Sequence, residues 1–127
     1  MKNKLPAIEP TKSELEILQV LWHTGPATVR AVHTELEKQR DINYTTTLKL
    51  MQIMTEKGLL KRDETEMKHV YAVVEEEHKT KSHLLQKFVD SMYKGSASQL
   101  VMQLLGNKKT SSQEIQEIRE LLKKLDK

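Results

Sequence analysis

A run of hydrogen-bonding side chains, Tyr44-Thr45-Thr46-Thr47, opens a stretch whose apolar residues repeat at helical spacing up to Gly58. Steps of 100° per residue turn one side of this predicted helix, residues 44–57, inward: Thr47, Leu50, Met51 and Met54. The opposite side carries Thr45, Lys49 and Gln52, with Thr46 and Leu48 at its edges. Threonine and glutamine can hydrogen-bond base edges in the DNA major groove, and lysine can reach guanine or phosphate. The other interpretation is an ordinary solvated face, but β-branched and aromatic residues are poor helix formers, which indicates selection for something besides helix stability.

A second group of residues could contact the phosphates that flank such a site. Thr28 and Arg30 lie at the start of the preceding predicted helix, where the helix N-terminus favours an anion. Arg62, Lys68 and His69 lie in or beside a predicted hairpin, although acidic residues in the same segment weaken the positive field there. The sequence therefore predicts a double-stranded DNA site built from these residues and the exposed face of helix 44–57.

Other chemistries lack the residues that they need. The chain contains no cysteine, so it has no disulfide, thiolate ligand or cysteine nucleophile. The histidines have no metalloprotease spacing, and surface or wing positions are predicted for all of them: His23, His33, His69, His78 and His83. The four glycines form no phosphate-binding loop, and no serine elbow is present. We expect no catalytic residue, no metal site and no cofactor, and hence a protein that is not an enzyme.

The elements that must position these residues can be read from caps and periodicity. A capping box at residues 11–14 predicts a helix over 12–23, and Thr28 can cap a helix that ends near Gln39 or Arg40. Asn43 can cap the helix over 44–57, and Gly58 can end it. Short strands are predicted at 59–62 and 69–74, with residues 63–68 as the hairpin tip. Three helices and a hairpin predict a mainly α fold, a winged helix-turn-helix domain over residues 1–75.

The rest of the chain, residues 76–127, is predicted to be helical, with a break at Gly95 and a last helix that starts at Ser111 or Ser112. About 50 residues bury too little surface for a closed core of their own, so we expect a helical region that forms a homodimer. The alternative is that these helices fold back onto the N-terminal domain. The apolar residues expected to form the dimer contact are Leu84, Leu85, Phe88, Met92, Leu100, Val101, Leu104, Leu105, Ile115, Ile118, Leu121, Leu122 and Leu125.

Charge and hydropathy limit the partners. Residues 1–77 carry a net charge of −2 and residues 78–127 a net charge of +5, so bulk charge does not explain DNA binding by the N-terminal part. A winged-helix module that binds protein is therefore the alternative function. No run of about 18 apolar residues exists, and the first ten residues lack the apolar centre of a signal peptide, so we expect a cytoplasmic protein without a membrane segment.

Four motifs at ordered spacings resemble the family of penicillinase and methicillin-resistance repressors and their copper-responsive relatives. They are residues 11–29 with Trp22 and Gly25-Pro26, then Tyr44-Thr45-Thr46-Thr47, then Glu56-Lys57-Gly58-Leu59-Leu60, then Tyr93-Lys94-Gly95-Ser96. The resemblance covers nearly the whole chain. It implies a homodimeric winged-helix repressor on a dyad-symmetric operator, with helix 44–57 in the major groove.

The resemblance also implies roles for individual residues. Thr46 falls where members of the family place a base-contacting threonine, and Tyr44, Thr45 and Lys49 lie along the same contact surface. Leu48 stands where some relatives have an arginine. In antibiotic-responsive members a sensor protease system releases the repressor by cleavage after the glycine of the Tyr-Lys-Gly motif, which makes Ser96, Ala97 and Ser98 the candidate cleavage residues here. The Asn-Phe pair cut in those relatives is missing. Copper-responsive members carry a C-terminal cysteine cluster, which this chain lacks.

Overall fold

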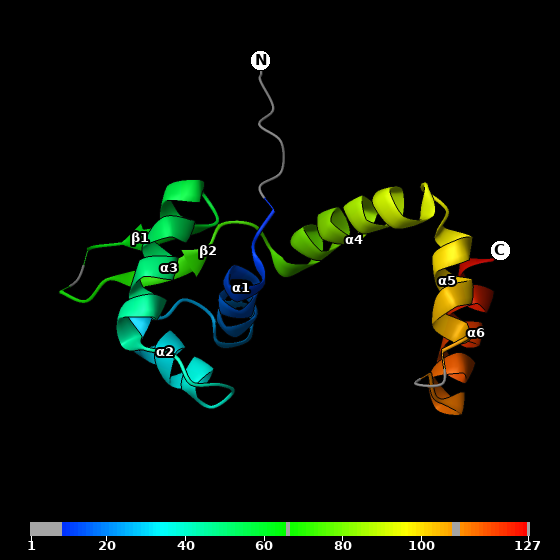
Figure 1. The fold of residues 1–127 in the computed structure, drawn as a ribbon, viewed down its shortest axis with the longest axis horizontal. Coiled ribbons are helices and arrows are strands. Elements are labelled where there is room, and N and C mark those ends of the chain that lie inside the picture. Colours follow the sequence, from blue (N-terminus) through cyan, green and yellow to red (C-terminus); the bar gives the residue numbers. More distant parts are fainter. Residues whose placement is uncertain (1–8, 66, 108–109, 127) are drawn as a thin grey trace, which may run out of the picture. The chain divides into compact units, whose positions relative to one another are not determined.

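Helices dominate the protein, and the strands of the described residues form one two-stranded sheet (Figure 1). The computed structural model describes residues 9–65, 67–107 and 110–126. The chain divides into two compact units, Met1–His83 and Leu84–Lys127. The predicted class, mainly α with a small hairpin, is confirmed.

The first unit begins with three helices and a hairpin, in the order α1 (Lys12–Thr24), α2 (Val29–Glu37), α3 (Tyr44–Lys57), β1 (Leu60–Asp63) and β2 (Val70–Val73). The bounds of α3 are those predicted, and α1 is one residue longer than expected. Each strand differs from its prediction by a residue or more at its ends. Asp63, expected in the hairpin tip, pairs with Val70 inside the sheet, and its side chain accepts a hydrogen bond from the Thr65 backbone N–H at 2.9 Å.

The ends of α1 are set by local hydrogen bonds. The Thr11 hydroxyl accepts from the Glu14 backbone N–H at 3.2 Å, and the Glu14 carboxylate accepts from the Thr11 backbone N–H at 2.9 Å, which completes the predicted capping box. Gly25 ends the helix with φ near 83° and ψ near −175°, a conformation that is almost restricted to glycine.

Two predictions for the next helices are wrong in detail. The helix α2 ends at Glu37, two to three residues before the predicted end, because the N–H groups of Lys38 and Gln39 bond to carbonyls three residues back and tighten the last turn. Asn43 does precede α3, but its side chain makes no capping hydrogen bond. Its carbonyl accepts from the backbone N–H groups of Thr46 and Thr47 instead.

The hairpin is held against the helices by a contact that the sequence pattern did not reveal. The strands β1 and β2 pair antiparallel, with Leu60 opposite Val73 and Arg62 opposite Tyr71. Ala27, in the segment between α1 and α2, pairs with Tyr71 through two backbone hydrogen bonds of 2.8 and 3.0 Å. This third segment extends the ladder, which matters because a two-stranded hairpin alone is only marginally stable.

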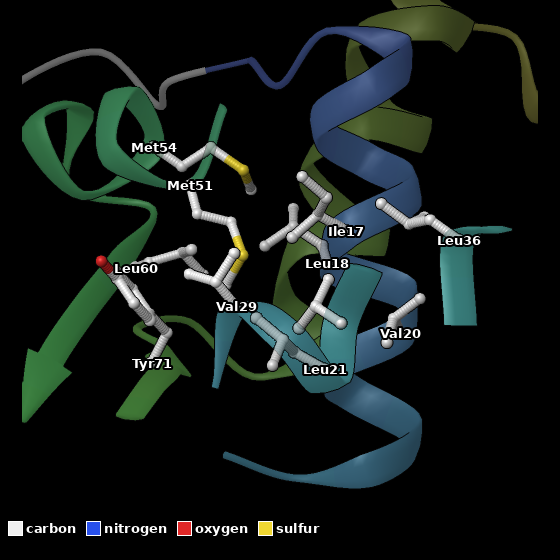
Figure 2. Packing of buried hydrophobic residues seen from close by; sticks show 11 residues of the cluster. Ile17, Leu18, Val20, Leu21, Val29, Leu36, Met51, Met54, Leu60 and Tyr71 are labelled. Atoms are coloured by element: carbon white, nitrogen blue, oxygen red, sulfur yellow. The ribbon is translucent and has the colours of Figure 1, made fainter. Parts of the chain in front are cut away.

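One hydrophobic cluster holds the first unit together, and Figure 2 shows it from close by. The buried side of α1 faces Met51 and Met54 of α3, and the strands contribute Leu60 and Tyr71 to the cluster. The fully or nearly fully buried members are Ile17, Leu18, Val20, Leu21, Val29, Val32, Leu36, Met51, Met54, Leu60 and Tyr71. Leu50, predicted to point inward with Met51, is only partly buried at the edge of this cluster.

The remaining helices are α4 (Glu77–Tyr93), α5 (Ala97–Leu105) and α6 (Ser112–Leu125). The α5 helix is capped by Ser96, and α6 by Ser111 in a capping box with Glu114. Among the described residues from Leu84 onward, Val89 is the one buried residue. No helix within the described ranges is both long and apolar enough to cross a membrane.

Candidate nucleic-acid interface

The exposed face of α3 is the first part of the candidate site. Thr45, Thr46, Lys49 and Gln52 are exposed, as predicted, because Thr47, Met51 and Met54 on the opposite side are buried in the core. Leu48 is half-buried and packs against the edge of the cluster. The α3 helix therefore presents a row of short hydrogen-bonding side chains and one lysine to solvent, which is a surface that can read base edges.

The N-terminal end of α2 is the second part. The Thr28 hydroxyl caps α2 by accepting from the Ala31 backbone N–H at 3.1 Å. The Arg30 guanidinium carbon lies 4.1 Å from the centre of the Tyr44 ring, a cation–π contact that joins the starts of α2 and α3. Arg30 is thus an exposed cation whose position is already restricted, and it lies next to a helix N-terminus that favours an anion.

The hairpin supplies the third part, with mixed charge. Lys68 and His69 are exposed, and Met67 beside them is fully exposed. Arg62 forms an ion pair with Glu64, with Nε 2.6 Å from the carboxylate. The Tyr71 hydroxyl and Glu64 together raise the pKa of Arg62 above its ordinary value. Because Glu64 compensates its charge, Arg62 is a weaker candidate for phosphate contact than Lys68.

These parts meet at a groove of about 500 Å³ on the first unit. Six of the residues singled out from the sequence line it: Thr28, Arg30, Tyr44, Leu48, Lys68 and His69. The exposed residues of α3 follow from Tyr44 along the helix, whereas Arg62 does not line the groove. The fold therefore brings residues from three separate segments of the chain to one place.

The structure corrects the prediction for one histidine. His33, expected at the surface or in the hairpin, is 3% exposed and lies between α2 and α3. Its sequence position offers a signal for this, because His33 follows Val32 and lies four residues after Val29, both on the buried side of α2. Met67 and the ring contacts of Tyr44 were likewise not anticipated.

The second unit exposes much apolar surface. Large apolar side chains of α4, α5 and α6 are exposed: Leu85, Phe88, Met92, Val101, Met102, Leu104, Leu105, Leu121, Leu122 and Leu125. All except Met102 were singled out from the sequence, and Leu84, Leu100, Ile115 and Ile118 of the same set are partly buried. Exposed apolar side chains that gather in a large patch are typical of interaction sites, which makes these residues candidates for one.

The candidate cleavage residues lie at the start of α5. Lys94 has a φ of 49° and Gly95 a φ of 82°, and these left-handed residues separate α4 from α5. The Ser96 hydroxyl caps α5 by accepting from the Gln99 backbone N–H at 3.2 Å, and Ala97 and Ser98 are exposed in the first turn. The segment is accessible, but Ala97 and Ser98 are helical.

Three helices followed by a hairpin, with α3 exposed beside the hairpin, give the first unit the winged helix-turn-helix fold. A solved MarR family protein from Bacillus stearothermophilus shares the fold, with a TM-score of 0.54 at 20% identity over 93% of this chain and 74% of that chain.

The family follows from the sequence comparison. The family model of the penicillinase repressor matches residues 10–124, so the chain belongs to the penicillinase repressor family. The methicillin resistance regulatory protein MecI of Mammaliicoccus sciuri is 27% identical over 98% of this chain and 99% of that protein. The penicillinase repressor of Staphylococcus aureus is 23% identical over 100% and 99%. The transcriptional regulator BlaI of Mycobacterium tuberculosis is 37% identical over 62 residues, 48% of this chain and 45% of that protein.

Proposed function

We propose that this protein is a homodimeric transcriptional repressor that binds a dyad-symmetric DNA operator. The observation that carries the proposal is the convergence of the candidate DNA-contacting residues on one groove beside the exposed face of α3. The membership in a family of repressors supports it. Residues 1–75 serve DNA binding in this proposal, and residues 76–127 serve dimerisation.

The two halves of the proposal depend on each other. The first 77 residues carry a net charge of −2, so a single winged-helix domain attracts DNA weakly through bulk charge. Joining two such domains makes the second contact intramolecular, with an effective concentration of about millimolar. The exposed apolar side chains of α4 to α6 are the surface that joins the two copies.

Release follows from the same arrangement. Cleavage at Ser96, Ala97 or Ser98 separates α5 and α6 from the winged-helix domain. The two winged-helix domains of the dimer are then no longer joined through these helices. The expected agent is a sensor protease, for which the first turn of α5 must unwind. Incubation with such a protease should yield a fragment that ends near residue 96, and a chain that stays intact while DNA is released would exclude this route.

The first experiment is a DNA titration. Full-length protein selects duplexes from a random-sequence library, and the enriched duplex is then titrated against a scrambled duplex at two salt concentrations. We expect two chains per duplex, resistance to the scrambled competitor, and an affinity that falls steeply with salt, because phosphate neutralisation releases counterions. Failure to enrich any duplex, with little salt dependence, would instead favour a winged-helix module that binds a protein partner.

A further inference from the structure

The His33 side chain joins α2 to the first turn of α3. Its Nδ1 lies 2.9 Å from the Thr47 hydroxyl, and its Nε2 lies 3.2 Å from the Glu37 carboxylate. Its ring meets the Tyr44 ring in a T-shaped contact, with the ring centres 5.4 Å apart. Only 4% of the His33 side chain is exposed, so the ring is shielded from water, whereas the Glu37 side chain is 58% exposed.

His33 has two polar partners, one at each ring nitrogen. The Thr47 hydroxyl and Nδ1 share a hydrogen bond in which either atom can be the donor, depending on the tautomer of the ring. The Glu37 carboxylate lies 3.2 Å from Nε2, and its negative charge favours a proton on that nitrogen. With the proton on Nε2, Nδ1 of the neutral ring accepts from the Thr47 hydroxyl.

The Tyr44 ring connects this buried group to the exposed site. It contacts His33 through the T-shaped pair and also carries the Arg30 guanidinium on its face at 4.1 Å. Arg30 and His33 are three residues apart on α2, and Tyr44 and Thr47 are three residues apart on α3, so each pair lies on one side of its helix. Two side chains from each helix therefore set the register between α2 and the start of α3.

We propose that His33 is a positioning residue, which holds Tyr44 and through it Arg30 in place at the end of α3 that reads DNA. This proposal rests on the proposed function, because its consequence is a change in the preference for one DNA sequence over another. Hydrogen bonds to base edges weaken steeply with displacement, whereas long lysine and arginine side chains follow a phosphate that has moved. Loss of the His33 contacts should therefore reduce discrimination between duplexes more than it reduces non-specific affinity.

Two variants test the contacts without removing the ring. Thr47→Val replaces the hydroxyl with a methyl group of similar shape, and Glu37→Gln allows either ring nitrogen to carry the proton. Glu35→Gln is the matched control, because it removes the same charge from α2 but its partner is Lys38, at 3.0 Å. Thermal unfolding of each variant identifies the temperature range in which all of them are folded.

The first readout is NMR of the full-length protein and needs no DNA. In the native chain the nitrogen signals of His33 should show the proton on Nε2, and the Arg30 side-chain signals should be shifted by the Tyr44 ring. Thr47→Val and Glu37→Gln should move the Arg30 signals toward those of a free arginine, and Glu35→Gln should not. The proposal is overturned if the Arg30 signals are unchanged in both variants, or if the proton lies on Nδ1 of His33 in the native chain. Both outcomes are independent of what the protein binds.

The second readout is the ratio of affinities for the enriched and the scrambled duplex. We expect Thr47→Val and Glu37→Gln to lower this ratio at least about fivefold, the low end of what one base contact contributes, while Glu35→Gln leaves it unchanged. If the two variants unfold at a lower temperature but keep the affinity ratio of the native chain, His33 is only structural. If the native chain prefers neither duplex, the proposed function fails, and the NMR readout still decides whether His33 positions Tyr44 and Arg30.

Discussion

Thr46 and Lys49 lie exposed on α3, so truncation of either side chain removes no buried contact. We expect Thr46→Ala to weaken binding of the enriched duplex by about 1–3 kcal/mol relative to scrambled duplex, because a base contact is lost. Lys49→Ala should also reduce the salt dependence if it contacts phosphate. The free energy of unfolding should change by no more than about 0.5 kcal/mol, as is usual for surface positions. Competition binding and denaturant unfolding measure the two quantities.

A matched control for Lys49→Ala is Lys12→Ala, which removes an exposed lysine from α1, outside the proposed interface. Lys12→Ala should leave the preference for the enriched duplex unchanged. Parallel losses of stability and preference in Thr46→Ala and Lys49→Ala would show that these side chains are structural rather than DNA-contacting.

Glu14 combines a capping role with a buried ion pair. It is 2% exposed, completes the capping box of α1, and binds the Lys57 ammonium group at 2.8 and 3.0 Å. Burial raises the pKa of Glu14, but the hydrogen bonds from Lys57 and from the Thr11 backbone outweigh it, so the pKa is lowered below the ordinary 4.5. The pair joins the start of α1 to the end of α3.

Glu14→Gln keeps a side-chain oxygen for the capping box but removes the charge. We expect a loss of about 1–3 kcal/mol in the free energy of unfolding at neutral pH, the range for hydrogen bonds to charged groups. The pKa of Glu14 is lowered in the folded state, so the native chain should be more stable than Glu14→Gln by the full amount above pH 4.5. This difference in the free energy of unfolding should disappear as the pH falls through the lowered pKa. Denaturant unfolding at a series of pH values measures this difference.

Glu16→Gln is the control for this prediction, since Glu16 pairs with Arg40 at 3.0 Å in a more exposed ion pair on the same helix. Exposed pairs contribute about 0–1 kcal/mol, so its effect should be smaller. Equal losses in the two variants, or a difference between Glu14→Gln and native that persists at low pH, would contradict the assignment to the Glu14–Lys57 pair.

At the scale of elements, two glycines end helices in different backbone conformations. Gly58 has φ 87° and ψ 9°, and the N–H groups of Gly58 and Leu59 bond to the carbonyls of Thr55 and Met54, a Schellman motif. Gly25 has φ 83° and ψ −175°, a region that asparagine does not tolerate. A Cβ at either position would meet no atom within 4 Å, so any cost of substitution is conformational.

We expect Gly58→Ala to lower the free energy of unfolding by about 1 kcal/mol, and Gly58→Asn by less, because asparagine adopts left-handed helical angles more readily. Gly25→Ala should cost about 1–3 kcal/mol, and Gly25→Asn should give no rescue. Denaturant unfolding of the four variants tests the contrast. A rescue by asparagine at position 25 would contradict the conformational explanation.

Helix starts marked by a side-chain cap were predicted well, whereas ends and contacts without a sequence signal were not. Thr11 and Thr28 were predicted as caps, and each accepts from a backbone N–H three residues later. The early end of α2 has no such signal, because backbone bonds to carbonyls three residues back, which no particular side chain marks, tighten its last turn. The pairing of Ala27 with Tyr71 joins residues far apart in the chain, so no local pattern could indicate it.

At the scale of the whole molecule, the apolar surface of α6 is proposed to join two chains. Leu122 is 57% exposed, and an aspartate there would place a charge in the proposed interface. We expect Leu122→Asp to shift the protein from dimer to monomer in analytical ultracentrifugation. Gln116→Asp, which introduces the same residue at an exposed polar position of α6, should remain dimeric. If the native protein is a monomer, or if Leu122→Asp and Gln116→Asp are both dimers, the proposed dimer surface is wrong.

Removal of residues 96–127 tests the link between dimerisation and DNA binding. The hydrophobic cluster of the first unit comprises residues between Leu15 and Val73, so the truncated chain should stay folded. Its affinity for the enriched duplex should fall about 10²- to 10⁴-fold, because the gain in affinity from two joined winged-helix domains is lost. Circular dichroism checks folding, and titration measures affinity. Undiminished affinity would show that a single winged-helix domain is enough.

The sequence alone determined the helices, the hairpin, the exposed face of α3 and the apolar faces of α4 to α6, because caps and periodicity act within a few residues. Only the tertiary structure decided how the parts meet. It brought Arg30, Tyr44 and Lys68 to one groove, and it buried His33 and Glu14 beside partners 14 and 43 residues away. A buried polar group requires a partner, and folding, rather than local sequence, selects which distant residue supplies it.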